Sequence, residues 1–92
     1  MIRSFKCRDT EKLWAAQRVA AFQAFEQVAR RKLRMLEAAT RLGDLKVPPN
    51  NKLEALKGDR LGQHSIRIND RWRVCFVWAD GHATNVEIVD YH

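Results

Sequence analysis

The 92-residue chain has few of the residues that build metal centres or disulfide frameworks. Its two cysteines, Cys7 and Cys75, lie far apart, and no CxxC pair occurs. Zinc sites usually combine Cys and His ligands at short, paired spacings, whereas the three histidines here are scattered. We therefore expect no metal and no other cofactor, and we expect both thiols to be reduced and structural.

Long apolar runs are also absent. No stretch reaches the roughly 18 apolar residues that a membrane-spanning helix needs, and the N-terminal sequence MIRSFKCRDTEK lacks the apolar segment of a signal peptide. Internal repeats and low-complexity segments are missing as well. With 46% apolar and 30% charged residues, we expect one small globular domain over residues 1–92, located in the cytoplasm.

The net charge of +6 comes entirely from the first 56 residues. Residues 1–56 hold twelve Lys or Arg against six Asp or Glu, whereas residues 57–92 hold five of each. A strongly basic small protein suggests a polyanionic partner, most often nucleic acid. The alternative on charge alone is a basic protein without such a partner.

The first half of the chain carries two helical patterns. In residues 20–43, apolar residues recur at spacings of three and four, which predicts an amphipathic helix that ends at Gly43. Asp9 or Thr10 predicts the N-cap of an earlier helix. Because no Gly or Pro separates the two patterns, they form either a hairpin with a break near Val19–Gln23 or one longer helix.

Alternating patterns predict strands at both ends of the chain. Residues 1–7 predict a weak first strand, and residues 44–51 predict a loop because Pro48-Pro49 cannot continue a helix. Three strands then follow over residues 62–68, 71–78 and 84–90, with turns at Asn69-Asp70 and Asp80-Gly81. The order β-α-α-β-β-β predicts an α+β fold with two helices packed on a mostly antiparallel sheet.

The strand at 71–78 has two chemically different faces. One face is apolar and consists of Trp72, Val74, Phe76 and Trp78. We expect the helices to cover it, so that these aromatic rings belong to the core and do not stack on bases. The other face consists of Arg71, Arg73, Cys75 and Val77, and we expect it to be open to solvent.

The chain ends on an acid, an aromatic residue and an imidazole, Asp90-Tyr91-His92. RNA cleavage without a metal needs a base for the 2′-hydroxyl, cations for the phosphate and a proton donor for the leaving oxygen. Asp90 and His92 can handle protons in either order, Arg73 and Lys57 can hold the phosphate, and Tyr91 can stack on a base or donate its hydroxyl. Each residue also has an ordinary alternative, since strand arginines are often solvated and terminal histidines often fray.

Further arginines are candidates for holding RNA or the ribosome. They lie on the polar side of the long predicted helix and among the predicted strands: Arg30, Arg31, Arg34, Arg60, Arg67 and Arg71. A run of basic residues on a helix is more often simply a solvated face, so this docking role is a hypothesis.

Three segments in order resemble one known family. MIRSF, LEALKGDRLGQHSIRINDRWRVCF and VEIVDYH are similar to the HigB/GraT branch of the RelE/ParE toxin superfamily. The resemblance implies a compact RelE-like fold and a type II toxin that enters the ribosomal A site and cleaves translated mRNA. It also implies a cognate HigA-like helix-turn-helix antitoxin, and activity that depends on Lys57, Arg73, Asp90, Tyr91 and His92.

One position departs from this pattern. Some relatives carry a histidine a few residues before the LKGDR segment, and this chain has Glu54 near that place. Glu54 is therefore a possible substitute base, and the alternative is a slower enzyme.

Three functions follow as hypotheses from different classes. The first is a ribosome-dependent endoribonuclease. The second is a gyrase inhibitor of ParE type on the same fold, which would not need residues 90–92. The third is a binding module that occupies RNA or the ribosome without cutting. Deletion of residues 90–92 and mapping of mRNA ends on translating ribosomes distinguish them.

Overall fold

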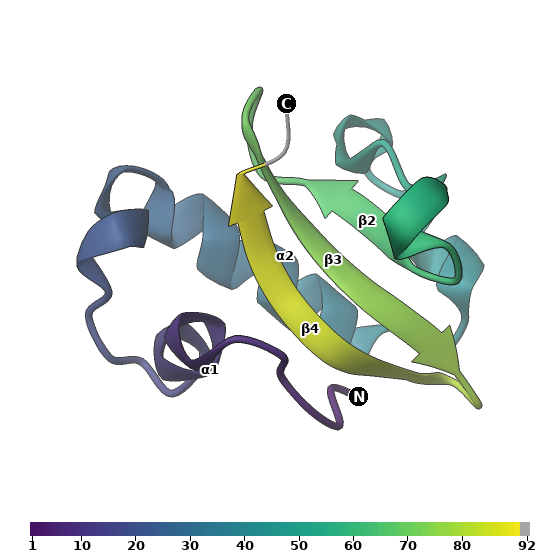
Figure 1. Cartoon of the computed structure of the whole chain (residues 1–92), viewed down its shortest axis with the longest axis horizontal. Helices are drawn as coiled ribbons and strands as arrows, with labels where there is room; N and C mark the ends of the chain where they lie inside the picture. Colours follow the sequence, from purple (N-terminus) through teal and green to yellow (C-terminus); the bar gives the residue numbers. More distant parts are fainter. Residues whose placement is uncertain (91–92) are drawn as a thin grey trace.

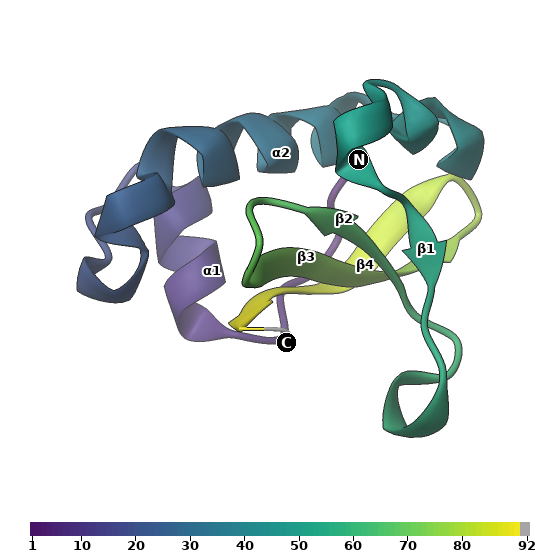
Figure 2. The ribbon, with the colours of Figure 1, turned by 90° about the horizontal axis from the view of Figure 1, so that it is seen from above.

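The computed structural model describes residues 1–90, which form a helical layer on a four-stranded sheet (Figure 1). The helices are α1 (Arg8–Trp14) and α2 (Glu26–Ala38). The antiparallel sheet has the order β1 (Glu54–Ala55), β2 (His64–Arg67), β3 (Trp72–Ala79) and β4 (His82–Asp90). Figure 2 shows α2 along one face of the sheet. The expected α+β architecture is confirmed, and no helix within residues 1–90 is long and apolar enough to span a bilayer.

Short 3-10 helices join these elements. They are η1 (Ala20–Phe25), η2 (Leu42–Lys46), η3 (Pro49–Asn51) and η4 (Gly58–Arg60). The helix η1 joins α1 to α2, and η4 lies between β1 and β2. The helices η2 and η3 cover most of residues 44–51, which the sequence predicts as a loop. In Figure 2 the η4 turn lies on the side of the sheet opposite α2.

The core lies between α2 and the apolar face of β3. Leu33 and Leu36 of α2 and Val74 and Phe76 of β3 are fully buried. Trp72 packs against the 3-10 helix η1, with its ring centroid 4.9 Å from that of Phe25. The expectation that the β3 aromatic residues serve the core is therefore confirmed for Trp72 and Phe76.

The two helices are separate, and their boundaries differ from the prediction. α1 ends at Trp14, before the expected break, and Ala16 then takes a left-handed conformation with φ of 65°. α1 begins after Cys7 without a side-chain cap, so the predicted N-cap at Asp9 or Thr10 is wrong. Thr10 is instead fully buried, where its Oγ1 accepts a hydrogen bond of 2.9 Å from the amide of Ile88 in β4.

Gly43 does not terminate α2, which ends at Ala38. The carboxylate of Asp44 accepts hydrogen bonds from the amides of Thr40 (3.0 Å) and Arg41 (3.1 Å), which draws the chain into η2. These amide donors lower the pKa of Asp44. A side chain four residues ahead therefore decides how the chain leaves the helix, and Gly43 lies inside the next turn.

The predicted first strand is an extended segment with two isolated bridges. Ile2 pairs with Ala83 and Phe5 pairs with Val86, both in parallel orientation. Between these two bridges the pairing with β4 is interrupted at Asn85, which has φ of 52°. The amide of Asn85 donates a hydrogen bond to the Ser4 hydroxyl instead. The segment nevertheless covers the outer edge of β4, which would otherwise expose unpaired backbone groups.

The two predicted hairpin turns have different outcomes. Asp80 and Gly81 both have positive φ, 53° and 77°, which matches the tight turn expected there. The turn at Asn69-Asp70 is wider and occupies residues 68–71. The Asn69 side chain accepts hydrogen bonds from the amides of Arg71 and Trp72, both at 2.9 Å, and thereby holds the wider loop.

The second face of β3 is not open to solvent as expected. Cys75 is fully buried, and Arg73 is only 7% exposed to solvent. The chain between residues 52 and 63 turns back over this face, because β1 adds to the sheet beside β2 and contributes partners to Arg73. Arg71, which precedes the strand, is exposed.

Burial also determines which thiol can react. It raises the pKa of the Cys75 thiol to about 11, whereas Cys7 is only half-buried. Since the thiolate is the reactive form, we expect one rapidly reacting thiol per native chain at pH 8 and two in denaturant, measured with a thiol-specific chromophore. Cys7→Ser should remove the rapid phase, and a rapid phase that survives this substitution would contradict the assignment.

Candidate active site

The guanidinium of Arg73 is bound on three sides. Its Nε donates to the Ser65 hydroxyl at 2.9 Å, and its Nη2 donates to the backbone carbonyl of Lys52 at 2.7 Å. Its Nη1 lies 2.9 Å from a carboxylate oxygen of Glu54. These contacts come from β2 and from the chain that forms β1, so Arg73 is held rigidly on the face of the sheet opposite α2.

Glu54 is therefore a direct neighbour of the predicted phosphate-binding residue. Its backbone pairs with that of Ser65, and its side chain is 52% exposed. The sequence placed Glu54 near the position of a histidine in relatives, but it did not indicate the ion pair with Arg73.

Asp90 lies on the strand next to Arg73. Arg73 pairs with Val89 across β3 and β4, and Asp90 is the next residue, opposite Trp72. The carboxylate of Asp90 forms an ion pair with Arg71. Arg71 donates hydrogen bonds to this carboxylate, and these bonds, together with the negative charge of Asp90, raise the pKa of Arg71. Tyr91 and His92, the remaining residues of the predicted tail, lie outside the described residues.

Lys57 begins the η4 turn, three residues after Glu54. Its side chain is exposed and forms no ion pair with another residue in the 1–90 range. The following Gly58 has φ of 63°, which a residue without a side chain adopts easily. Of the two predicted phosphate-binding cations, Arg73 and Lys57, Lys57 is thus the one without an ion-pair partner among residues 1–90.

Glu87 is a residue of this face that sequence reasoning missed. Its side chain is 13% exposed and lies 3.3 Å from Arg60 and 3.5 Å from Lys6. Glu87 thereby ties both the η4 turn and the N-terminal segment to the sheet. The alternation of β4 contained the signal, because Val86 and Ile88 are inward and the residue between them must face outward.

Most of the predicted RNA-binding arginines already have acidic partners. Arg30 pairs with Glu26, Arg60 with Glu87, Arg67 with Asp70 and Arg71 with Asp90. Arg30 also donates to the backbone carbonyls of Leu13 and Gln17, and so ties α2 to the end of α1. Arg31 and Arg34 are exposed on α2 and form no side-chain bond within the described chain.

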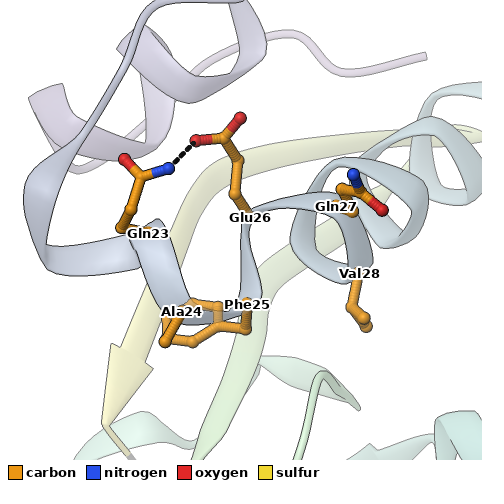
Figure 3. A pocket seen from close by; sticks show the side chains of 6 residues that line it. All are labelled: Gln23, Ala24, Phe25, Glu26, Gln27 and Val28. Atoms are coloured by element: carbon orange, nitrogen blue, oxygen red, sulfur yellow. Dashed lines mark hydrogen bonds between the residues drawn. The ribbon is translucent and has the colours of Figure 1, made fainter.

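A surface hollow lies elsewhere, at the junction of η1 and α2 (Figure 3). Residues 23–28 line it, and the Gln23 amide donates to the Glu26 carboxylate at 3.2 Å across it. The hollow belongs to the helical layer, whereas Arg73 lies on the opposite face of the sheet. Its facing side chains Gln23 and Glu26 are already bonded to one another, so the charged face around Arg73 is the better candidate for chemistry.

Solved structures of other proteins share this fold. The YoeB toxin in the YoeB–YefM complex from Staphylococcus aureus aligns with a TM-score of 0.58 and 20% identity, covering 100% of this chain and 98% of that one. The YoeB dimer from the same organism aligns with a TM-score of 0.54 over 99% and 97% of the two chains. At this identity the likeness establishes a shared fold and nothing more.

Sequence comparison then gives the family. Residues 5–92 match the family model of the RelE-like toxin of the type II toxin-antitoxin system HigB, so the chain belongs to this HigB-like family. The Endoribonuclease HigB of Proteus vulgaris is 34% identical over 94 residues and the full length of both chains. Toxin HigB-1 of Vibrio cholerae is 44% identical over 62 residues, 67% of this chain and 65% of that protein.

Proposed function

We propose that this toxin is a ribosome-dependent endoribonuclease that cleaves translated mRNA in the A site. The observation that carries the proposal is the rigid guanidinium of Arg73 on a sheet face that also bears Glu54, with Asp90 at the end of the adjacent strand. The Proteus relative, which matches over the whole chain, is named an endoribonuclease. The 2′-hydroxyl attacks the adjacent phosphorus, the bond to the 5′-oxygen breaks, and the products are a 2′,3′-cyclic phosphate and a 5′-hydroxyl.

Each predicted residue has a role in this reaction. Arg73 and Lys57 stabilise the negative charge that develops on the phosphate. Asp90 and His92 take the proton from the 2′-hydroxyl and return one to the leaving oxygen, in either assignment. Tyr91 positions a base by stacking or through its hydroxyl.

The exposed basic residues of α2 support docking to the ribosome. Arg31 and Arg34 are the predicted RNA-binding arginines that keep free guanidinium groups within residues 1–90. Both arginines lie within the first 56 residues, which carry the net charge of +6. Contacts to rRNA phosphates follow from charge, do not depend on base sequence and weaken with salt.

We also propose a cognate HigA-like antitoxin as the partner that restrains the toxin in the cytoplasm. The supporting observations are the family of the chain and the YoeB–YefM complexes from Staphylococcus aureus, in which a toxin of the same fold is bound to an antitoxin.

The test maps mRNA 5′ ends in a translating extract to which the toxin is added. We expect new ends within translated codons, absent when initiation is blocked. Lys57→Ala should lower the cleavage rate by about 100-fold, because it removes one phosphate cation without disturbing a described contact. Deletion of residues 90–92 should abolish cleavage.

Lys46→Ala is the matched control, since Lys46 is an exposed lysine on η2, and it should cleave at the wild-type rate. Translation arrest without new ends would replace the nuclease by a blocking module. DNA-damage signalling that survives deletion of residues 90–92 would favour gyrase inhibition.

A further inference from the structure

The Glu54 carboxylate occupies the accessible part of Arg73. Two of the three partners of the guanidinium are internal, because Ser65 is fully buried and the second partner is the backbone carbonyl of Lys52. The third partner is Glu54, whose side chain is 52% exposed, whereas that of Arg73 is 9% exposed. An anion that approaches Arg73 from solvent therefore meets Glu54 first.

Carboxylates and phosphates compete for the same donors on a guanidinium. The planar fork of arginine binds both through N–H···O bonds of similar geometry. Since Nη1 is 2.9 Å from Glu54, a phosphate cannot take that position while the carboxylate remains there. The negative charge of Glu54 also opposes the approach of a second anion.

Replacing the Glu54 carboxylate by an RNA phosphate at Arg73 requires little rearrangement. The backbone of Glu54 is fixed by its pairing with Ser65, but its half-exposed side chain can turn toward water. Because one partner of this ion pair is half-exposed to water, an RNA phosphate held also by Lys57 can displace the carboxylate. Meanwhile Ser65 and Lys52 keep the guanidinium in place.

We propose that Glu54 is an anionic gate on Arg73: its carboxylate occupies the guanidinium in the free toxin and leaves when an RNA phosphodiester binds. This inference rests on the proposed function, because it takes Arg73 as the phosphate-binding group. The charge of Glu54 then sets the affinity for RNA, and Glu54 is a positioning residue that takes no proton from the substrate.

The gate and the substitute base give opposite expectations for Glu54→Gln. Glutamine keeps the length of the side chain and can still accept a hydrogen bond from Arg73 through its carbonyl oxygen, but it carries no charge. If Glu54 is a gate, its loss of charge strengthens RNA binding. If Glu54 is the base, RNA binding hardly changes and cleavage is lost.

The experiment measures binding of a short single-stranded RNA whose 2′-hydroxyls are methylated, so that it cannot be cleaved. Fluorescence anisotropy with the full chain should show about fivefold tighter binding for Glu54→Gln than for wild type, in line with the free energy of one such ion pair. The side-chain ¹H–¹⁵N signal of Arg73 reports occupancy at this site. It should shift at a lower RNA concentration in Glu54→Gln.

Asp59→Asn is the matched control. Asp59 is exposed on the neighbouring η4 turn and forms no ion pair within the described chain, so this variant loses the same charge without touching Arg73. It should bind RNA within about twofold of wild type, as expected for a screened surface charge. The gain from Glu54→Gln should also disappear in an Arg73→Lys background, which keeps the charge but loses the fork.

Each outcome decides between the proposals. If Glu54→Gln binds no tighter than Asp59→Asn, the gate is overturned. If binding is unchanged while cleavage in the translating extract is lost, Glu54 is the base and the gate is equally overturned. If Glu54→Gln binds tighter but neither it nor wild type cleaves mRNA, the gate stands and the nuclease proposal fails.

Discussion

Arg73→Ala is expected to lower the free energy of unfolding by about 3 kcal/mol and, in addition, to abolish cleavage. The guanidinium bonds Ser65, the Lys52 carbonyl and Glu54, and only 9% of the side chain is exposed. Alanine leaves the buried Ser65 hydroxyl without this partner and leaves a void beneath the chain that covers the sheet. Urea unfolding followed by circular dichroism should show a midpoint lowered by about 1–2 M.

This dual effect changes how toxicity is interpreted. An Arg73→Ala variant is expected to be destabilised as well as deprived of its phosphate cation, so growth alone cannot separate the two losses. Lys57→Ala is the matching variant, because Lys57 is exposed and has no ion-pair partner in residues 1–90. We expect it to keep the wild-type urea midpoint and to cleave about 100-fold more slowly. An unchanged midpoint in Arg73→Ala would contradict the buried network.

The parts of the fold that the sequence predicted have regular periods. Alternation over eight residues assigned Val74 and Phe76 to the core face of β3, and both are fully buried. Asp80-Gly81 predicted its turn because positive φ values favour these residue types. The spacing of three and four predicted α2, although it extended the helix in both directions, over the 3-10 helix Ala20–Phe25 and beyond Ala38. Long periodic elements are predictable because many residues report the same geometry.

The covered face of β3 was not predictable in this way. β1 has only two residues, and the neighbouring η4 turn has three, so neither carries a period that a sequence can display. The ion pair between Glu54 and Arg73 spans nineteen positions and depends on where that short strand joins the sheet. Burial of Arg73 is therefore a tertiary property, whereas alternation predicts only the face on which the residue lies.

Charge counting had a similar limit. The sequence shows which residues are cationic, but it does not show which carboxylate each one meets. Arg67 and Arg71 looked available for RNA, and in the structure both pair with aspartates, Asp70 and Asp90. The lysine and arginine count is therefore an upper limit on the free cations of the surface. Partner assignment requires the fold.

The second large effect is expected at a buried lysine that has no acidic partner among residues 1–90. Lys32 of α2 is 6% exposed, and its Nζ donates a hydrogen bond of 2.6 Å to the side-chain oxygen of Asn51, which is fully buried. No ion pair within residues 1–90 includes Lys32. The Asn51 amide in turn donates to the Leu45 carbonyl at 3.1 Å. One amide therefore joins α2 to the chain that leads into β1.

Asn51→Ala is expected to lower the free energy of unfolding by about 3 kcal/mol at pH 7. It removes the acceptor of a buried ammonium and the donor to a buried carbonyl, and alanine replaces neither. Urea unfolding monitored by tryptophan fluorescence gives the value. Asn50→Ala is the control, because Asn50 is exposed on the same 3-10 helix, and it should stay within about 0.5 kcal/mol of wild type.

The same lysine should make stability depend on pH. Burial, followed by the charges of Arg31 and Arg67, lowers the pKa of Lys32 below its usual 10.5. Between the lowered folded pKa and 10.5 the unfolded chain binds more protons than the folded one, so stability contributed by this group rises with pH in that window. Lys32→Met should flatten the rise relative to wild type, which isolates Lys32 from other groups that titrate there. If Lys32→Met and wild type keep parallel profiles up to pH 10.5, the ammonium is not desolvated, and only the lost hydrogen bond to the Leu45 carbonyl would remain to explain a loss in Asn51→Ala.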